Sequence, residues 1–272
     1  MRRVAVRRST EKGLCVSEIA VPKSQYAQVA DLLRGRIEDG TYPKGSLLPS
    51  EDRLADELRL SRVTVNKALG LLRASGDVRV RRGMGTQVRT LPRIQRDAQA
   101  RYASRQEGTG AGEVEARRLN LHSRTAYGEI GQVTPPARVA DVLRLGKDDS
   151  TLLRPRVLYA DEEPTQIADS YMPWSIVGGC EPLLRDDTGP GGSYGRLAEI
   201  GHGPIRFVED VTVRMPTEVE RAVLDLEPVQ PVFEIWHVAY TGEDLPVEVC
   251  IHVMPGHLWQ LRYAWNDRAD GS

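Results

Sequence analysis

The sequence predicts an α+β protein of two unequal domains: a small helical domain, then a larger one built on an antiparallel sheet. Three observations predict this fold class. The first 91 residues are basic and contain three amphipathic helical stretches followed by two short strands. Residues 92–112 lose this periodicity and end in a Gly-rich run, as a linker or a partly ordered entry to the next domain would. Residues 113–266 are acidic and hold one helix–strand–strand pattern twice. A chain of 272 residues has room for both domains.

The charge is divided between the two parts of the chain. Residues 1–91 hold 18 Lys and Arg against 10 Asp and Glu, which leaves 19 against 28 of the chain's 37 and 38 for residues 92–272. The basic part suits a polyanion such as nucleic acid. The chain has no apolar run of about 18 residues and no apolar secretory signal, so we expect a cytoplasmic protein without membrane contact.

The basic part predicts three helices in order. Apolar residues recur at helical spacing over 24–40 and predict the first helix. After the loop TYPKGSLLP, Ser50 is expected to cap a second helix. Ser61 is expected to cap a third helix, which ends at Gly76. The residues of this third helix expected to face the core are Val65, Ala68, Leu69 and Leu72.

Two short helices separated by a tight turn form a helix-turn-helix, whose second helix offers its N-terminal residues to the major groove. Arg62 can then read a guanine edge or hold a phosphate, and Asn66 can pair with adenine or a phosphate. The following stretch DVRVRRGMGTQVR predicts strands 78–81 and 86–89 around a Gly-rich turn, a basic wing. The candidate DNA-binding residues are Ser50, Arg53, Ser61, Arg62, Thr64, Asn66, Lys67, Arg81, Arg82, Gly83, Gly85 and Thr86.

These motifs carry a family resemblance. The opening helix, LLPSEDRLADEL, SRVTVNKALGLLRASG and RRGMGT stand in the order and spacing of the winged-helix domain of GntR-family bacterial transcription regulators. Residues 22–91 are therefore expected to be a winged helix-turn-helix domain that binds double-stranded operator DNA. The chain departs from the family pattern at Asp52, where many members carry an arginine, and at Asn66, which replaces a frequent arginine.

The acidic part contains a twofold repeat. Residues 134–173 and 214–255 both run through Pro, an amphipathic helix, Leu-x-Leu, a strand, an acidic turn and a second strand that ends in Met-Pro. A helix followed by a hairpin, made twice, predicts an antiparallel sheet with pseudo-twofold symmetry and helices on one face.

Strand alternation predicts which side chains of these hairpins share a face. In LLRPRVLY, Arg154 and Arg156 project the same way, and such a pair can bind a phosphate or carboxylate. The alternative is that both arginines pair with acids such as Asp169 on an exposed face. In the second hairpin, Glu248 is expected on one face with Cys250 and His252, while Val247, Val249 and Ile251 supply the core.

RPRVLYADEEPTQIADSYMP, GGSYGRLAEIG and LPVEVCIHV resemble the UTRA domain of HutC-type GntR regulators, which has a chorismate-lyase-like fold. Residues 113–266 are therefore expected to be a UTRA domain that binds an effector and dimerises. By position, the resemblance implies an effector site for a small anion such as a sugar phosphate or carboxylate. Its candidate residues are Arg154, Arg156, Asp169, Tyr171, Ser193, Tyr194, Glu248 and Trp259.

We expect no catalytic site, metal or cofactor. His202 and His257 lack a second ligand at a suitable spacing, the three cysteines form no CxxC pair, and there is no Gly-rich phosphate loop or GxSxG elbow. The expected function is a homodimeric repressor that binds an inverted repeat and is released by its effector. Two alternatives remain open: a constitutive repressor whose C-terminal domain only dimerises, and a lyase-like enzyme.

Overall fold

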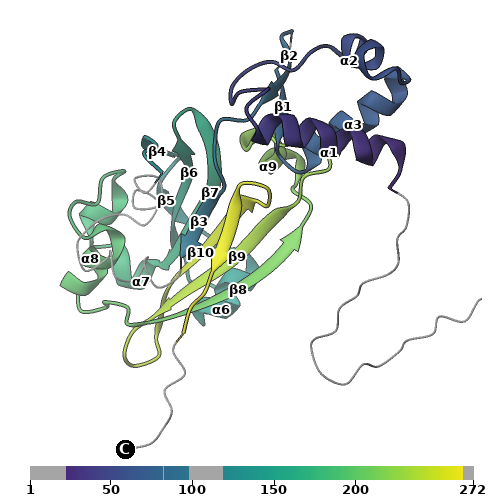
Figure 1. The fold of residues 1–272 in the computed structure, drawn as a ribbon. Coiled ribbons are helices and arrows are strands. Elements are labelled where there is room, and N and C mark those ends of the chain that lie inside the picture. Colours follow the sequence, from purple (N-terminus) through teal and green to yellow (C-terminus); the bar gives the residue numbers. More distant parts are fainter. Residues whose placement is uncertain (1–22, 82, 98–118, 266–272) are drawn as a thin grey trace, which may run out of the picture.

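The computed structural model describes residues 23–81, 83–97 and 119–265. They form a small helical domain, here called the head, and a larger domain around a seven-stranded sheet (Figure 1). The head lies at one end of the sheet (Figure 1). None of the helices in these ranges is both long and apolar enough to cross a membrane.

The head begins with the three expected helices. They are α1 (Gln25–Glu38), α2 (Glu51–Leu58) and α3 (Arg62–Ala74). The hydroxyls of Ser50 and Ser61 accept hydrogen bonds from backbone amides in the first turns of α2 and α3. Each bond satisfies an amide that has no acceptor within its own helix, so the predicted caps are confirmed.

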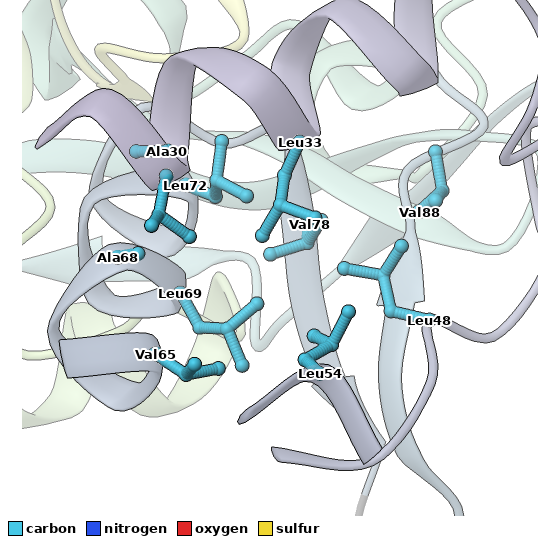
Figure 2. Packing of buried hydrophobic residues seen from close by; sticks show 11 residues of the cluster. Ala30, Leu33, Leu48, Leu54, Val65, Ala68, Leu69, Leu72, Val78 and Val88 are labelled. Carbon is cyan, nitrogen blue, oxygen red and sulfur yellow. The ribbon is translucent and has the colours of Figure 1, made fainter. Parts of the chain in front are cut away.

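A hairpin completes the head and closes its core. Strand β1 (Val78–Arg81) pairs antiparallel with β2 (Gly85–Val88). Apolar side chains from the helices and the hairpin meet in one cluster, with Leu33, Leu54 and Leu72 fully buried (Figure 2). The predicted inner face of α3 is part of it, because all four expected residues of that helix are buried. The head is therefore a winged helix-turn-helix.

The second domain is an antiparallel sheet with strand order β4-β6-β7-β10-β9-β8, and β5 pairs with β6. The strands are β4 (Ser123–Tyr127), β5 (Gly131–Val133), β6 (Thr151–Ala160), β7 (Glu163–Pro173), β8 (Arg206–Arg214), β9 (Val232–Tyr240) and β10 (Pro246–Pro255). The two predicted hairpins, β6–β7 and β9–β10, lie side by side because β7 pairs antiparallel with β10. The pseudo-twofold repeat is thereby confirmed.

The helices are divided between the two faces of the sheet. Helix α6 (Ala137–Leu143) packs on one face, here called the α6 face, and the turn after α9 (Glu218–Val223) packs on the same face. The expectation that all helices lie on one face is wrong. At one end, α7 (Trp174–Val177), η1 (Glu181–Leu184) and α8 (Gly192–Glu199) cover the opposite face, because side chains of β6 and β7 that point there pack against them.

The expected linker, residues 92–112, begins with structure. Strand β3 (Ile94–Asp97) pairs in parallel with β11 (Trp259–Arg262), and Leu91 is buried with Ile94 in a cluster of the second domain. The linker interpretation is therefore corrected for residues 94–97, which belong to the second domain by pairing and packing. Residues 98–112 lie outside the described ranges.

Candidate nucleic-acid interface and effector site

The outer side of α3 carries three of the predicted DNA-binding residues. Arg62, Asn66 and Lys67 are exposed, and the Arg62 side chain retains 65% of its accessible surface. Arg62 and Asn66 stand one helical turn apart and so share a face. Thr64 is only half exposed, and its hydroxyl lies 2.9 Å from that of the cap Ser61. Thr64 and Ser61 therefore fix the start of the helix, while the other three point outward.

The N-terminal end of α2 lies next to this surface. The Ser50 hydroxyl accepts from the Arg53 amide at 3.2 Å, and the Arg53 side chain is exposed. Both residues are thus at the surface beside α3, where they were expected.

Two acids at the start of α2 contact the outward groups of α3, and sequence reasoning missed these contacts. The Glu51 carboxylate accepts from Asn66 Nδ2 at 2.7 Å and pairs with Arg62 Nε at 3.2 Å. Asp52 pairs with Arg62 Nη1 at 3.2 Å. The sequence alone indicates for both acids only a favourable interaction with the positive N-terminal end of the α2 dipole. The family pattern provides the one signal that could have found Asp52, since an acid replaces a frequent arginine there.

The wing turn requires its glycines. Gly83 and Gly85 have φ values of +77° and +109°, which residues with a Cβ rarely adopt. Thr86 follows in β2 and is half exposed. Arg82 lies outside the described residues. A glycine turn of this kind lets backbone amides approach a phosphate closely.

Of the three described wing arginines, Arg79, Arg81 and Arg89, only Arg81 is exposed. Arg81 is exposed, and its Nε donates to Gln87 Oε1 at 3.0 Å. Arg79 Nε donates to the same oxygen at 3.2 Å, but the Arg79 side chain is only 14% exposed and turns toward the second domain. Arg81 is thus available to DNA and Arg79 is not.

The head and the second domain are joined by an ion-pair cluster. Glu163, at the tip of the β6–β7 hairpin, lies 2.6 Å from Arg79 Nη1 and 3.4 Å from Arg89 Nη1. All three side chains are less than 15% exposed. Burial lowers the pKa of the Arg89 guanidinium, and the charge of Glu163 opposes that shift.

Further contacts between the domains involve the end of α3. Gln230 Nε2 donates to the carbonyl of Arg73 at 2.7 Å. Gly76 has φ +77° and approaches the His257 ring so closely that a Cβ there would lie 2.3 Å from a ring carbon. Burial lowers the pKa of His257 to about 3. The C-terminal end of α3 is thus in direct contact with the second domain.

Three of the predicted effector residues, Arg156, Tyr194 and Glu248, lie on the face of the sheet opposite α6, here called the polar face. Arg156 donates to Ser170 Oγ at 2.8 Å, and its other terminal nitrogen lies 3.6 Å from Cys250 Sγ. The Tyr194 hydroxyl donates to the Glu248 carboxylate. None of the carboxylates in the described ranges forms an ion pair with Arg156.

The electrostatics of the polar face favour a charged Arg156. Burial alone would lower the pKa of its guanidinium, but nearby negative charge, including that of the Glu248 carboxylate, raises that pKa above its usual value. Burial raises the pKa of the Cys250 thiol, so this cysteine is a buried neutral group, as expected.

Arg154 points to the same face, but its guanidinium is already hydrogen-bonded to backbone carbonyls. Its guanidinium donates to the carbonyls of Leu183, Arg185 and Asp186, the last at 3.1 Å. These bonds hold the segment that leads to α8, in whose first turn Ser193 lies. The alternative that the two arginines pair with acids on an exposed face is not observed, because Arg154 is buried and forms no ion pair among the described residues.

The placement of Asp169 and Tyr171 in this site is corrected by the sheet register. Asp169 faces Pro155, and Tyr171 faces Leu153, so both point to the α6 face, away from Arg156. Tyr171 packs there in the cluster formed with α6.

Trp259 also differs from its expected role. Its indole N–H donates to the carbonyl of Thr165 at 2.7 Å, and its ring is buried with Leu91 and Ile94. Trp259 therefore completes a core cluster and does not line the polar face. In the described ranges, no three His, Cys, Asp or Glu side chains come together as a metal site.

Comparison with known proteins agrees with this geometry. Residues 25–88 match the gntR family of bacterial regulatory proteins, and residues 118–259 match the UTRA domain. The chain is 28% identical over 258 residues to an uncharacterised HTH-type transcriptional regulator from Streptomyces coelicolor, covering 90% of this chain and 93% of that protein. It is 27% identical over 229 residues to the HTH-type transcriptional regulator GgaR from Escherichia coli, covering 83% and 85%.

Solved structures show the same fold. PhnF from Mycobacterium smegmatis matches with a TM-score of 0.56 and 22% identity, covering 90% of this chain and 100% of that one. A second structure, of a GntR-family transcriptional regulator, matches with the same score and identity. Regulators of this family bind operator DNA and typically act as dimers with small-molecule effectors. The chain therefore belongs to the GntR family, in the HutC-type architecture with a UTRA domain, and is a DNA-binding transcription regulator.

Proposed function

We propose that the protein is a homodimeric repressor that binds an inverted-repeat operator and is released by a small anionic effector bound on the polar face. The observation that carries the effector part is the state of Arg156. It is a partly buried cation that donates to the Ser170 hydroxyl, and no carboxylate in the described ranges forms an ion pair with it. A buried charge is costly unless it is paired, and an anionic ligand would supply the pair.

The DNA-binding part rests on the exposed groups of α3 and the wing. Arg62, Asn66 and Lys67 face outward from α3, and Arg81 faces outward from the wing. Side chains of this kind reach base edges and phosphates when the second helix of a helix-turn-helix enters the major groove. In a dimer, two such helices reach adjacent turns of DNA, so the operator is an inverted repeat.

The β6–β7 hairpin supports a coupling between effector and operator. Arg156 lies in β6 on the polar face, and Glu163 at the tip of the same hairpin holds Arg79 and Arg89 of the wing. An anion that binds Arg156 would therefore contact a hairpin whose tip is paired with the head. Release requires that the effector bind one arrangement of the heads better than the other, typically by about 1–3 kcal/mol.

Two substitutions test the two parts separately. Arg62→Ala is expected to weaken operator binding by about 1–3 kcal/mol and to leave effector binding unchanged. Arg156→Ala is expected to do the reverse. Each variant is thus the control for the other. Unchanged operator affinity and salt dependence in Arg62→Ala would show that α3 is not the recognition helix.

Effector binding is measured by thermal shift with a panel of sugar phosphates and small carboxylates. A ligand at 100 times its dissociation constant stabilises the folded state by about 2.7 kcal/mol. This shift is expected in the wild type and in Arg221→Ala, which removes an arginine from α9, and is expected to disappear in Arg156→Ala. A panel without any shift in the wild type favours the constitutive repressor.

We also propose that the protein has no enzymatic activity. Its relatives are transcriptional regulators, and a lyase-like fold alone is poor support for catalysis. Incubation with chorismate, followed by product analysis, tests this. Turnover above the level of a heat-denatured sample would overturn the proposal.

A further inference from the structure

We propose that Glu51 and Asp52 determine DNA specificity: their carboxylates position Arg62 and Asn66 toward base edges and keep Arg62 from binding phosphate. The proposal rests on the proposed function, in which these two groups of α3 read DNA. It adds two positioning residues from α2 that contact the reading groups and belong to neither the recognition helix nor the wing.

Glu51 joins the two reading groups. Its two carboxylate oxygens contact different residues, Asn66 Nδ2 at 2.7 Å and Arg62 Nε at 3.2 Å. The Glu51 side chain is itself held, since only 29% of it is exposed and it stands in the first turn of α2, where the helix dipole favours an anion. The arginine and the amide are therefore fixed relative to each other before DNA arrives. Such preorganisation lowers the entropy lost on binding a matching sequence.

Asp52 contacts Arg62 from a second direction. Its carboxylate lies 3.2 Å from Nη1, while Glu51 contacts Nε, so the guanidinium has an acid at two of its three nitrogens. A guanidinium carries five N–H donors. Glu51 accepts the hydrogen bond from Nε, so the donors on Nη1 and Nη2 can form the outer fork that binds O6 and N7 of guanine.

The charge balance at this point decides which ligand Arg62 accepts. One cation stands beside two carboxylates, so a phosphate that approaches meets a net negative charge. A guanine edge offers neutral acceptors and meets no such repulsion. The acids therefore weaken sequence-independent binding more than they weaken binding to a matching base pair. An acid at position 52, where arginine is frequent in the family, adds to this selectivity.

The test compares neutral variants with a matched control. Glu51→Gln and Asp52→Asn remove the charges with little change of shape. Asp56→Asn makes the same charge change at an exposed position of α2 whose side chain pairs with no described residue. Fluorescence anisotropy gives dissociation constants for two duplexes of equal length: one selected from a random pool by the wild-type protein, and one unrelated. The readout is the ratio of the two constants and its salt dependence, which a purely structural role would not change.

We expect Asp52→Asn and Glu51→Gln to lower the preference for the selected duplex by about threefold or more relative to Asp56→Asn, mainly through tighter binding to unrelated DNA. In an Arg62→Ala background, Asp52→Asn and Asp56→Asn should give the same ratio, because the group that Asp52 controls is gone. Equal ratios for all three variants in the otherwise wild-type protein would overturn the proposal. A pool that yields no consensus sequence would instead overturn the proposed reading of DNA by α3, and this inference with it.

Discussion

Neutralising Glu163 tests whether the β6–β7 hairpin holds the head. The carboxylate contacts Arg79 at 2.6 Å and Arg89 at 3.4 Å across the domain boundary. Glu163→Gln keeps the shape of the side chain and removes its charge. Glu162 is the matched control, because it is the preceding residue of the same turn and is exposed.

The magnitude follows from burial. The side chains of Arg79, Glu163 and Arg89 are 14%, 12% and 9% exposed, so solvent screens the cluster weakly. Loss of one member of a buried ion pair costs about 3–5 kcal/mol, because a charge is left without compensation. Here two guanidinium groups lose their shared acid, and Arg89 Nε already has no hydrogen-bond acceptor among the described residues. We expect Glu163→Gln to weaken the contact between the two domains by about 3 kcal/mol.

Two spectroscopic probes separate the domains in urea titrations. All four tryptophans lie at position 174 or beyond, so their fluorescence reports only the second domain. Far-ultraviolet circular dichroism also follows the head, which contains the two longest described helices, α1 and α3. In Glu163→Gln, the dichroism transition is expected to move to lower urea than the fluorescence transition, whereas Glu162→Gln should keep the wild-type curves. Identical transitions in the two variants would refute the proposed role of the cluster.

Three further outcomes are expected. Gly76→Ala should destabilise the protein more than Gly83→Ala, because both glycines have φ +77° but only the first added Cβ meets the His257 ring; equal melting temperatures would contradict the described packing. The pKa of His257 is about 3 in the folded state against its usual value of 6.5, so between these pH values only the unfolded chain takes up a proton. The free energy of unfolding of the wild type should therefore fall as the pH drops from 6.5 toward 3. His257→Phe should remove this contribution to the pH dependence, which urea titrations at several pH values measure. Burial raises the pKa of Asp169, so ionisation disfavours the folded state at neutral pH. Asp169→Asn should therefore raise the melting temperature at pH 7, an increase that disappears where aspartate is protonated in both states, and should leave the effector-induced shift intact.

The head could be predicted closely because its signals are local. Caps at Ser50 and Ser61, a helical stripe of aliphatic residues and glycines at the turns each specify a helix end, a buried side or a tight turn within a few residues. The contacts of Glu51 with Arg62 and Asn66 could not be predicted in the same way. They depend on the angle between α2 and α3, which the packing of the whole head decides.

The candidate effector site could be predicted only in part, because the alternation of side chains relates residues of one strand and not residues of neighbouring strands. It placed Arg154 and Arg156 on one face correctly. It could not say on which side of the sheet Asp169 and Tyr171 point, because that depends on the register between β6 and β7. It also gave no sign that Arg154 is occupied by backbone carbonyls of a distant segment.

The parallel pairing of β3 with β11 could not be predicted from the sequence either. The two strands are four residues each and lie far apart in the chain, so neither shows a long periodic pattern, and only the folded domain brings them together. The same pairing explains why Trp259 is a core residue.

The ion-pair cluster at the domain boundary sets a condition for exchanging modules between regulators of this type. A DNA-reading head transplanted onto this sensor domain would have to bring basic side chains to the positions of Arg79 and Arg89. Without them, the Glu163 carboxylate would be buried at the domain boundary without a cationic partner. The contact between the two domains of the chimera would then be weaker. Compatibility between such modules would thus depend on Glu163 and on two basic residues of the head, and heads that keep these two residues could be exchanged without any change in the β6–β7 hairpin.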